Sequence, residues 1–206
     1  MRCRNSFVAL VASCLFIAIT LSPVRAIAGP TDQIKTTVDK ALVVLKDPSL
    51  KAVAKTKERR DQLKQILFAR FDFIEMAKRA LGSDWRRRTA TEQEEFVHVF
   101  TGLLESAYTD TIESYSNEKI IYVGERLDGT YADVNSKILT AKGAEFSINY
   151  KAHLIGDEWR VYDVIVENIS MVNNFRSQFS RVIANSSYEE LVRKLKAKAD
   201  IRTQKN

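Results

Sequence analysis

The spacing of the apolar residues changes twice along the chain, and this change constrains the fold more than any other feature. Up to about residue 117 apolar residues recur at helical spacing, beginning with Ile34, Val38 and Leu42. From residue 119 to residue 167 they alternate with polar residues, as in strands, and a helical period then returns. Separate runs of helices and strands, instead of their regular alternation, indicate an α+β fold.

Four strands are predicted in this alternating region, with turn dipeptides at Asp128-Gly129 and Gly156-Asp157. The predicted strands are Lys119 to Glu125, Ala132 to Ile138, Phe146 to Leu154 and Glu158 to Glu167. Short turns join neighbouring strands into an antiparallel meander. The sequence therefore predicts a curved four-stranded antiparallel sheet with helices packed on one side, and the space between them is a natural place for an apolar cavity. Composition alone does not decide between a filled core and a ligand pocket there.

The predicted helices carry recognisable end signals. Asp47-Pro48 ends the first helix. Asp72 and Thr91 each stand three residues before a glutamate, which is the spacing of a capping box, and so predict two helix starts. Ser170 is positioned to cap the last long helix.

A helix predicted from about Lys51 to Ala69 is strongly basic. Its cations outnumber its acids, with Lys51, Lys55, Lys57, Arg59, Arg60 and Lys64 against Glu58 and Asp61. Such a run is either a solvated face or a docking surface for anionic lipid or an acidic partner. The sequence alone leaves both interpretations open.

The first 28 residues have the pattern of a secretory signal peptide. Arg2 and Arg4 precede an apolar run from Phe7 to Leu21, and Ala26 and Ala28 supply small residues at the positions that signal peptidase reads. The run is shorter than the roughly 20 apolar residues of a membrane-spanning helix. Cleavage after Ala28 and export are therefore expected, with a permanent membrane anchor as the weaker alternative.

Both cysteines, Cys3 and Cys14, lie in this N-terminal segment. Residues 29–206 are therefore expected to form one domain without a disulfide, a thiol nucleophile or a thiolate-bound metal. A lipoprotein attached at Cys14 is less favoured, because the following residues continue the apolar run instead of forming a polar tether. Removing the three arginines of the segment lowers the formal net charge from +6 to +3, which does not favour a nucleic-acid-binding protein.

The sequence shows no familiar catalytic or metal-binding motif. His98 and His153 have neither cysteine partners nor an obvious carboxylate grouping, so no metal site is predicted. There is no G-x-S-x-G elbow, glycine-rich phosphate loop or H-E-x-x-H motif. An acid–base enzyme stays possible with Asp163 as its base, because this residue shares strand parity with Val161 and would face an apolar environment. The alternative is a structural Asp163 that pairs with Arg176 or accepts backbone N–H groups.

Two long segments carry a family resemblance. Residues 71–85 read FDFIEMAKRALGSDW, and residues 159–176 read WRVYDVIVENISMVNNFR. Together with the signal peptide, the helix start TEQEEF at 91–96 and the stretch YEEL at 188–191, they resemble the toluene-tolerance, or MlaC, family of periplasmic phospholipid-binding proteins. The resemblance covers nearly all of the mature chain.

The resemblance implies a fold akin to nuclear-transport-factor-type domains, with a deep apolar cavity between helices and sheet. It implies that this cavity takes the acyl chains of a phospholipid while the head group faces water, without a catalytic residue or a cofactor. The implied role is a periplasmic shuttle between an outer-membrane lipoprotein–porin complex and an inner-membrane ABC transporter with a ring-forming substrate-binding subunit. Such transport maintains outer-membrane lipid asymmetry.

Thirteen residues are predicted to line the cavity: Phe73, Met76, Leu81, Phe100, Leu104, Tyr108, Val134, Ile148, Tyr150, Val164, Val166, Met171 and Phe175. Three alternatives stay open, namely a carrier of hopanoids, a small-cavity isomerase or dehydratase on the same fold, and an adaptor with a filled core. Asn168 stands where the family often has glycine, and asparagine tolerates left-handed backbone better than other non-glycine residues. The turn before Ser170 can therefore survive this departure.

Overall fold

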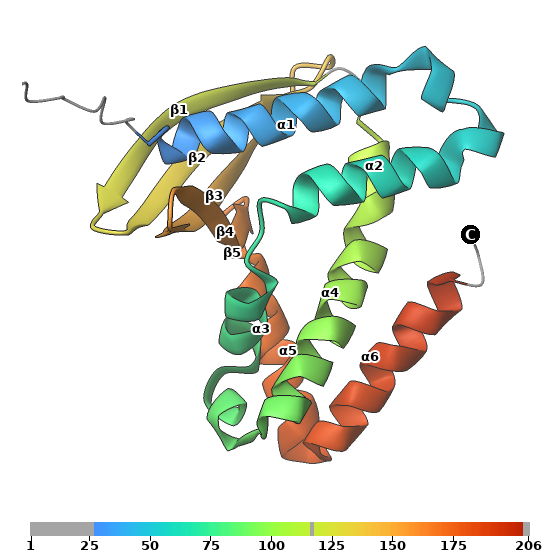
Figure 1. Cartoon of the computed structure of the whole chain (residues 1–206), viewed down its shortest axis with the longest axis vertical. Coiled ribbons are helices and arrows are strands. Elements are labelled where there is room, and N and C mark those ends of the chain that lie inside the picture. The colour runs from blue at the N-terminus through green and yellow to red at the C-terminus, as the bar shows by residue number, and fades with distance from the viewer. Residues whose placement is uncertain (1–26, 116–117, 204–206) are drawn as a thin grey trace, which may run out of the picture.

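The computed structural model describes residues 27–115 and 118–203 as helices around one antiparallel sheet (Figure 1). The α-helices are α1 (Pro30–Lys46), α2 (Thr56–Phe68), α3 (Phe73–Leu81), α4 (Ala90–Glu113), α5 (Met171–Asn185) and α6 (Tyr188–Thr203). The strands are β1 (Lys119–Asp128), β2 (Tyr131–Leu139), β3 (Glu145–Ile155), β4 (Glu158–Val166) and β5 (Ile169–Ser170). Short 3-10 segments are η1 (Pro48–Leu50), η2 (Val53–Lys55) and η3 (Gly82–Arg87). The expected α+β class is confirmed, whereas the predicted signal peptide lies almost wholly outside the described residues.

The strands stand in the sheet in chain order, from β1 at one edge to β5 at the other, and each neighbouring pair is antiparallel. The predicted four-strand meander is confirmed, and the two residues of β5 add a short fifth strand. The register shifts after Tyr122 in β1 and at Tyr162 in β4. An extra residue in one strand of a pair bends it and increases its twist, so these bulges contribute to the curvature of the sheet (Figure 1).

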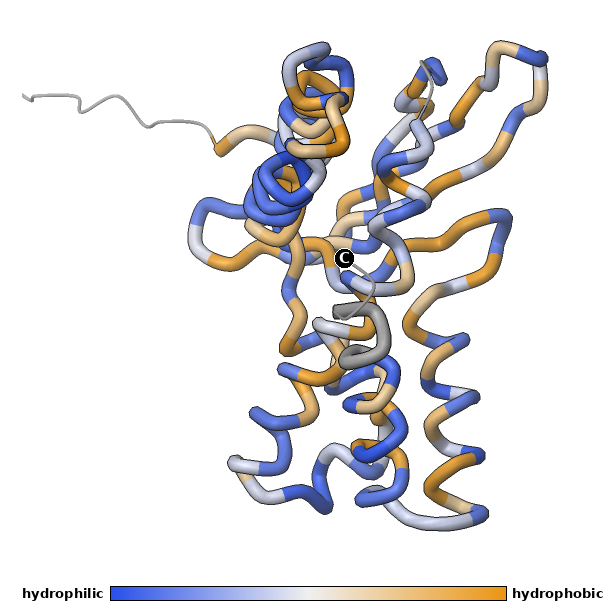
Figure 2. Tube along the Cα trace, turned by 90° about the vertical axis from the view of Figure 1, so that its right-hand side faces the viewer, coloured by the Kyte–Doolittle hydropathy of each residue, from blue (hydrophilic) through white to orange (hydrophobic). Residues whose placement is uncertain are grey.

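The helices cover one face of the sheet and one of its edges. Helix α1 crosses one face, where Ile34 belongs to the same apolar cluster as Val134 and Ala152. Helices α3 and α5 contact β4 at the far edge, and α4 and α6 pack against them (Figure 1). The side view in Figure 2 separates α1 and α2 from the strands at the top of the molecule. The sequence predicted helices packed on one side of the sheet; α1 lies on one face, and α3 and α5 pack at the β4 edge.

Three groups of buried apolar residues form the core. The sheet cluster is Ile34, Ala132, Val134, Ala152, Trp159, Val161 and Val164. The helical cluster joins α3, α4, α5 and α6 and includes Met76, Leu81, Phe96, Phe100, Leu104, Phe175 and Phe179. The corner cluster joins α1 to α2 through Ala41, Val44, Leu50 and Leu63.

Two predicted helix caps are confirmed. Asp72 accepts a hydrogen bond from the backbone N–H of Glu75 at 2.9 Å and caps α3. The Ser170 hydroxyl accepts one from the backbone N–H of Asn173 at 3.0 Å and caps α5. Asn168 has a φ of 65°, so the turn before this cap does use left-handed backbone.

The predicted starts of two helices are wrong. Helix α4 begins with a capping box formed by Thr89 and Glu92, not at Thr91. The motif occurs twice, as Thr89 with Glu92 and as Thr91 with Glu94. The helix uses the earlier pair, and the Gln93 side chain then also donates to the carbonyl of Trp85 at 3.0 Å. The basic helix starts later than predicted, at the first residue of α2, because the preceding residues form η1 and η2.

The cations of the basic helix are largely engaged with neighbouring acids. Exposed ion pairs join Lys55 to Glu58, Lys57 to Asp61 and Lys64 to Glu105. Arg59 and Arg60 both bind Glu113 of α4, at 2.7 and 2.9 Å. Burial works to raise the pKa of Glu113, but the hydrogen bonds from the two arginines outweigh it and lower that pKa. Most of this charge therefore holds α2 together and attaches it to α4.

Candidate functional site

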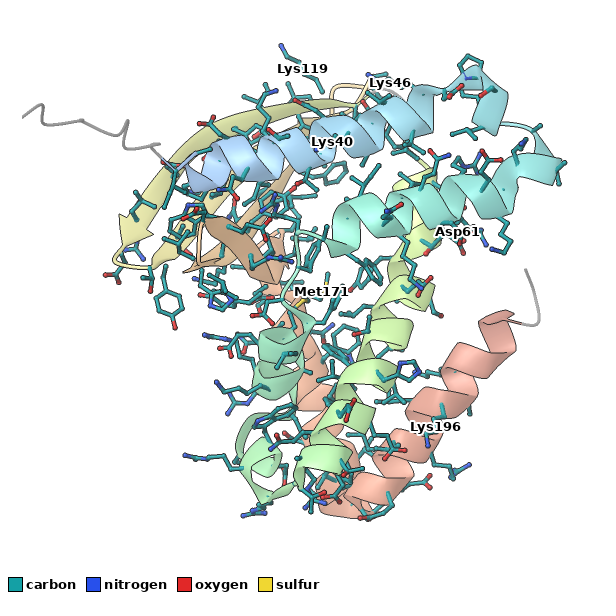
Figure 3. The ribbon with its side chains drawn as sticks, in the orientation of Figure 1. Lys40, Lys46, Asp61, Lys119, Met171 and Lys196 are labelled. Atoms are coloured by element: carbon teal, nitrogen blue, oxygen red, sulfur yellow. The ribbon has the colours of Figure 1, made fainter. Side chains whose placement is uncertain are left out.

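Partly buried apolar side chains pack against the sheet cluster, against the helical cluster or, in two cases, against both. Phe71 and Met171 pack against both the sheet cluster and the helical cluster. Figure 3 places Met171 near the centre of the molecule, where α5 leaves the sheet. The boundary residues, as we call them, are Phe71, Phe73, Tyr108, Tyr122, Ile148, Tyr150, Leu154 and Met171. Since they come from both layers, they offer apolar contact to an elongated ligand lying between sheet and helices.

The structure divides the thirteen predicted lining residues among different surroundings. Seven belong to the helical cluster or pack against it: Phe73, Met76, Leu81, Phe100, Leu104, Tyr108 and Phe175. Four belong to the sheet cluster or pack against it: Val134, Ile148, Tyr150 and Val164. Met171 contacts both clusters, and Val166 is 41% exposed at the end of β4. Five of the thirteen, namely Phe73, Tyr108, Ile148, Tyr150 and Met171, are thus among the boundary residues, and only Met171 of these packs against both clusters.

Several predicted lining residues are fully buried among protein neighbours. Met76 and Phe100 are 0% exposed and Leu81 is 1% exposed. The ring of Phe100 meets those of Phe175 and Phe179 edge-on, at centroid distances of 5.4 and 5.7 Å. Such edge-to-face packing is favourable in itself. In this structure the side chains of the clusters close onto one another, so the apolar cavity and its lining stay predictions.

Hydroxyl groups interrupt the apolar face beneath α1. Ser136 is paired with Tyr122 in β1 and with Ile148 in β3, and its hydroxyl donates to the Ile148 carbonyl at 2.5 Å. The Tyr122 hydroxyl is buried and has no hydrogen-bond partner among the described residues. Burial raises the pKa of Tyr122, with smaller effects in the same direction from Tyr150 and Asp39. Burial likewise raises the pKa of Tyr150, so both phenols are neutral near pH 7.

Replacing Tyr122 by phenylalanine is expected to stabilise the protein. A buried hydroxyl without a partner costs about 1–3 kcal/mol, so the variant should gain about 1 kcal/mol in free energy of unfolding. Tyr115→Phe is the matched control, because the Tyr115 hydroxyl donates to the Glu118 carbonyl at 2.8 Å and its loss should destabilise. Denaturant titration measures both. A Tyr122→Phe variant less stable than wild type would show that the hydroxyl finds a partner.

Asp163 has a structural role in the described geometry. Its Oδ1 accepts the backbone N–H of Val172 at 3.0 Å, and its Oδ2 accepts the Ser170 hydroxyl at 2.5 Å. Of the two structural alternatives raised by the sequence, the backbone contact is the one observed, and no ion pair with Arg176 is formed. Asp163 therefore ties β4 to the first turn of α5.

The expected strand parity of Asp163 is wrong. The bulge at Tyr162 pairs Val161 with Ala152 but Asp163 with Lys151, so the carboxylate faces away from the α1 side. An extra residue in one strand reverses the alternation beyond it. Asp163 is only 6% exposed, but its surroundings supply hydrogen-bond donors instead of the apolar environment that the sequence suggested.

The two histidines occupy different positions. His98 is exposed on α4, and His153 faces away from the apolar side of β3. The His153 ring stacks on Tyr131 at a centroid distance of 6.1 Å, and its Nε2 lies 2.9 Å from an oxygen of Asp72. Residues 27–115 and 118–203 hold no group of three metal-ligating side chains. None of their helices is long and apolar enough to cross a membrane.

Sequence reasoning missed three boundary residues. Tyr122 follows Ile120 at strand spacing in β1, so its alternation could have identified it. Leu154 lies in the alternating run of β3 and carried the same signal. Phe71 lies between α2 and α3, and its position depends on a bridge to Val161, ninety residues away in the chain. No local pattern predicts that contact.

Comparison with known proteins gives a consistent set of matches. Residues 35–197 match the family model described as "MlaC protein". The Intermembrane phospholipid transport system binding protein MlaC of Haemophilus influenzae is 25% identical over 126 residues, which span 59% of this chain and 59% of that protein. Less than two thirds of that relative is therefore matched. Toluene tolerance protein ttg2D of Pseudomonas putida is 27% identical over 170 residues, covering 81% of this chain and 79% of the relative.

One solved structure resembles nearly the whole described fold. It is the phospholipid-binding protein from Ralstonia solanacearum in complex with a phospholipid. The TM-score is 0.73 at 25% sequence identity, and the match covers 84% of this chain and 98% of the other. Both the order of the elements and their packing are therefore shared with a protein that holds a lipid.

Proposed function

Since the chain belongs to the MlaC family, we propose that it is a periplasmic phospholipid carrier that helps to maintain the lipid asymmetry of the outer membrane. One observation carries the proposal, namely the match to almost all of a phospholipid-bound protein. The two curated relatives, one named for phospholipid transport and one for toluene tolerance, support the same role. A cleaved signal peptide at residues 1–28 would bring the carrier to its compartment.

The energetics of phospholipid in water explain why a carrier is needed. Burying an acyl CH₂ group is worth about 0.8 kcal/mol, so two chains with roughly 30 such groups cost on the order of 20 kcal/mol to expose. A protein that covers the tails removes most of that cost, and it needs no catalytic group to do so. A carrier therefore needs only an apolar interior that can open to admit the acyl chains.

We place the acyl chains along the boundary residues, between the sheet cluster and the helical cluster. Ile148, Tyr150 and Met171 are only partly buried and share this region. Apolar side chains that are already partly exposed cost less to rearrange than a tightly packed core. The fully buried Met76, Leu81 and Phe100 would then support the site from behind instead of touching the lipid.

The proposed role is not enzymatic, and one observation favours a carrier over an acid–base enzyme with Asp163 as its base. Both oxygens of Asp163 are occupied by donors from the chain itself. A carrier also needs a donor and an acceptor. We propose an outer-membrane lipoprotein–porin complex and an inner-membrane ABC transporter with a ring-forming subunit, without nucleic acid or a cofactor.

Transfer between vesicles tests the carrier role directly. Residues 29–206, added to donor vesicles with a self-quenched fluorescent phospholipid and to unlabelled acceptor vesicles, should raise the transfer rate in proportion to protein concentration. Proportionality is expected because each chain carries its cargo through water. A rate unchanged by the protein at any concentration would contradict the proposal, and heat-denatured protein is the control for nonspecific membrane disruption.

A further inference from the structure

A hollow of about 590 Å³ opens on the face of the sheet opposite α1. Its walls are one side of α3, η3, the outer side of β3 and β4 and the first two turns of α5. The sheet separates it from Tyr122, Ile148 and Tyr150, which lie on the α1 face, so it is distinct from the part of the proposed lipid site on the strands. Its volume is in the range of ordinary ligand pockets, roughly 300–1,000 Å³.

Basic side chains dominate this hollow. Five cations line it, namely Lys78, Arg79, Arg86, Lys151 and Arg176, against the two acids Glu75 and Asp163. Glu75 binds two of the cations, Lys78 at 3.1 Å and Arg79 at 2.8 Å. The oxygens of Asp163 are occupied by Ser170 and Val172. Lys151 is bound to Asp133 outside the hollow at 2.9 Å, and the remaining cations still outnumber the acids, so the walls carry a net positive charge.

Two of the arginines in the hollow have no acidic partner in the described part of the chain. Within the described residues, neither Arg86 nor Arg176 forms an ion pair, in contrast to the largely paired cations of α2. Arg176 lies close to Gly82, where an added Cβ would stand 2.7 Å from its Nε. Gly82 also has a φ of 63°, a conformation that favours glycine. The end of α3 thus makes room for the Arg176 guanidinium beside the hollow.

Aromatic groups complete the walls and fix one cation. The Arg79 guanidinium lies over the Tyr162 ring at 4.1 Å from the centroid, and Trp85 also lines the hollow. A guanidinium held between a carboxylate and a ring is pre-organised, so little side-chain entropy is lost when it binds another group. The guanidinium of an arginine presents its N–H groups in a plane that suits bidentate binding of a carboxylate, and among the described residues Arg176 has no acid in that position.

From this arrangement we propose that the hollow is a docking site for a protruding acidic segment of a partner protein, whose Asp or Glu side chains bind the cations of α3, η3 and α5. A recessed site favours a protruding segment over a flat membrane surface, which would meet the rim first. Because the hollow lies on the opposite face of the sheet from Ile148 and Tyr150, a partner can dock here whether or not cargo lies against those strands.

The probe is a fluorescently labelled peptide of six glutamates. Its affinity for lipid-free residues 29–206 is measured by fluorescence anisotropy at low salt. The triple variant Lys78→Gln, Arg86→Gln and Arg176→Gln should weaken its binding at least about tenfold, since each lost cation removes a charge-assisted contact. The control carries Lys40→Gln, Lys142→Gln and Arg181→Gln, which remove the same charge outside the hollow. Its affinity should stay within about twofold of wild type.

Equal weakening by the two triple variants would overturn the proposal, because it would mean nonspecific attraction. Failure of wild type to bind the peptide, or binding to phosphatidylglycerol vesicles but not to the peptide, would overturn it as well, the latter in favour of a membrane site. If the triple variant does not fold, the binding site is mapped instead from the amide chemical shifts of the wild-type protein on addition of the peptide. The peptide should then shift Gly82 to Arg86 and Asn173, and shifts confined to other regions would contradict the site.

Discussion

An Ile148→Trp variant is expected to lose most of the phospholipid that purifies with the wild-type protein while it keeps the same fold. Ile148 lies on the α1 side of β3 and is only partly buried, so a larger ring there competes with acyl chains for space. Val134 is a poorer position for this test, because it is 0% exposed and overpacking a filled core costs about 1–3 kcal/mol. Phosphorus content per protein and the melting temperature are the two measurements.

The matched control for this variant is Ile74→Trp. Ile74 is 64% exposed on α3, so the same substitution there should leave both lipid content and melting temperature unchanged. A folded Ile148→Trp protein with the full lipid content of wild type would show that the acyl chains lie elsewhere. Loss of lipid in both variants would point to a general effect of added bulk.

An Asp163→Ala variant is expected to be strongly destabilised, by about 3 kcal/mol or more. The change removes two hydrogen bonds to a carboxylate and leaves the Val172 N–H without its acceptor in a buried place. Hydrogen bonds to charged groups contribute about 1.5–3 kcal/mol each, and an unsatisfied buried donor adds its own cost. Urea titration of lipid-free protein measures the loss.

Asp39→Ala is the control for Asp163→Ala. Asp39 forms an exposed ion pair with Lys35 on α1, and its replacement should change the free energy of unfolding by less than about 0.5 kcal/mol. Similar stabilities for wild type and Asp163→Ala would contradict the structural role. Full stability combined with loss of a measurable catalytic turnover would revive the enzyme alternative.

Local patterns explain how much of the fold could be predicted. The period-two region fixes four strands and their antiparallel order, and Asp72 and Ser170 cap the helices that follow them. The start of α4 could not be decided, since Thr89 and Thr91 both satisfy the same local motif. The bulge at Tyr162 has no local signature either, and it reverses the side on which Asp163 lies. Placing the helices at the β4 edge requires contacts between residues far apart in the chain.

The site could be predicted only in part, for a related reason. Strand parity correctly placed Val134, Ile148 and Tyr150 on one face. On the helices, the same apolar stripe supplies buried core such as Phe100 and boundary positions such as Tyr108, and periodicity does not separate them. That difference depends on which neighbouring elements cover each turn. Residues between elements, such as Phe71, carry no periodic signal at all.

The lipid content of the protein itself tests the central claim most directly. Residues 29–206, exported to a bacterial periplasm and purified without detergent, are extracted with solvent and analysed by mass spectrometry. The carrier account predicts phosphatidylethanolamine or phosphatidylglycerol at close to one molecule per chain, because an acyl chain in an apolar site has no more favourable place in water. A hopanoid in its place would contradict the assigned cargo, and protein that is empty, and stays empty after incubation with liposomes, would contradict the carrier role.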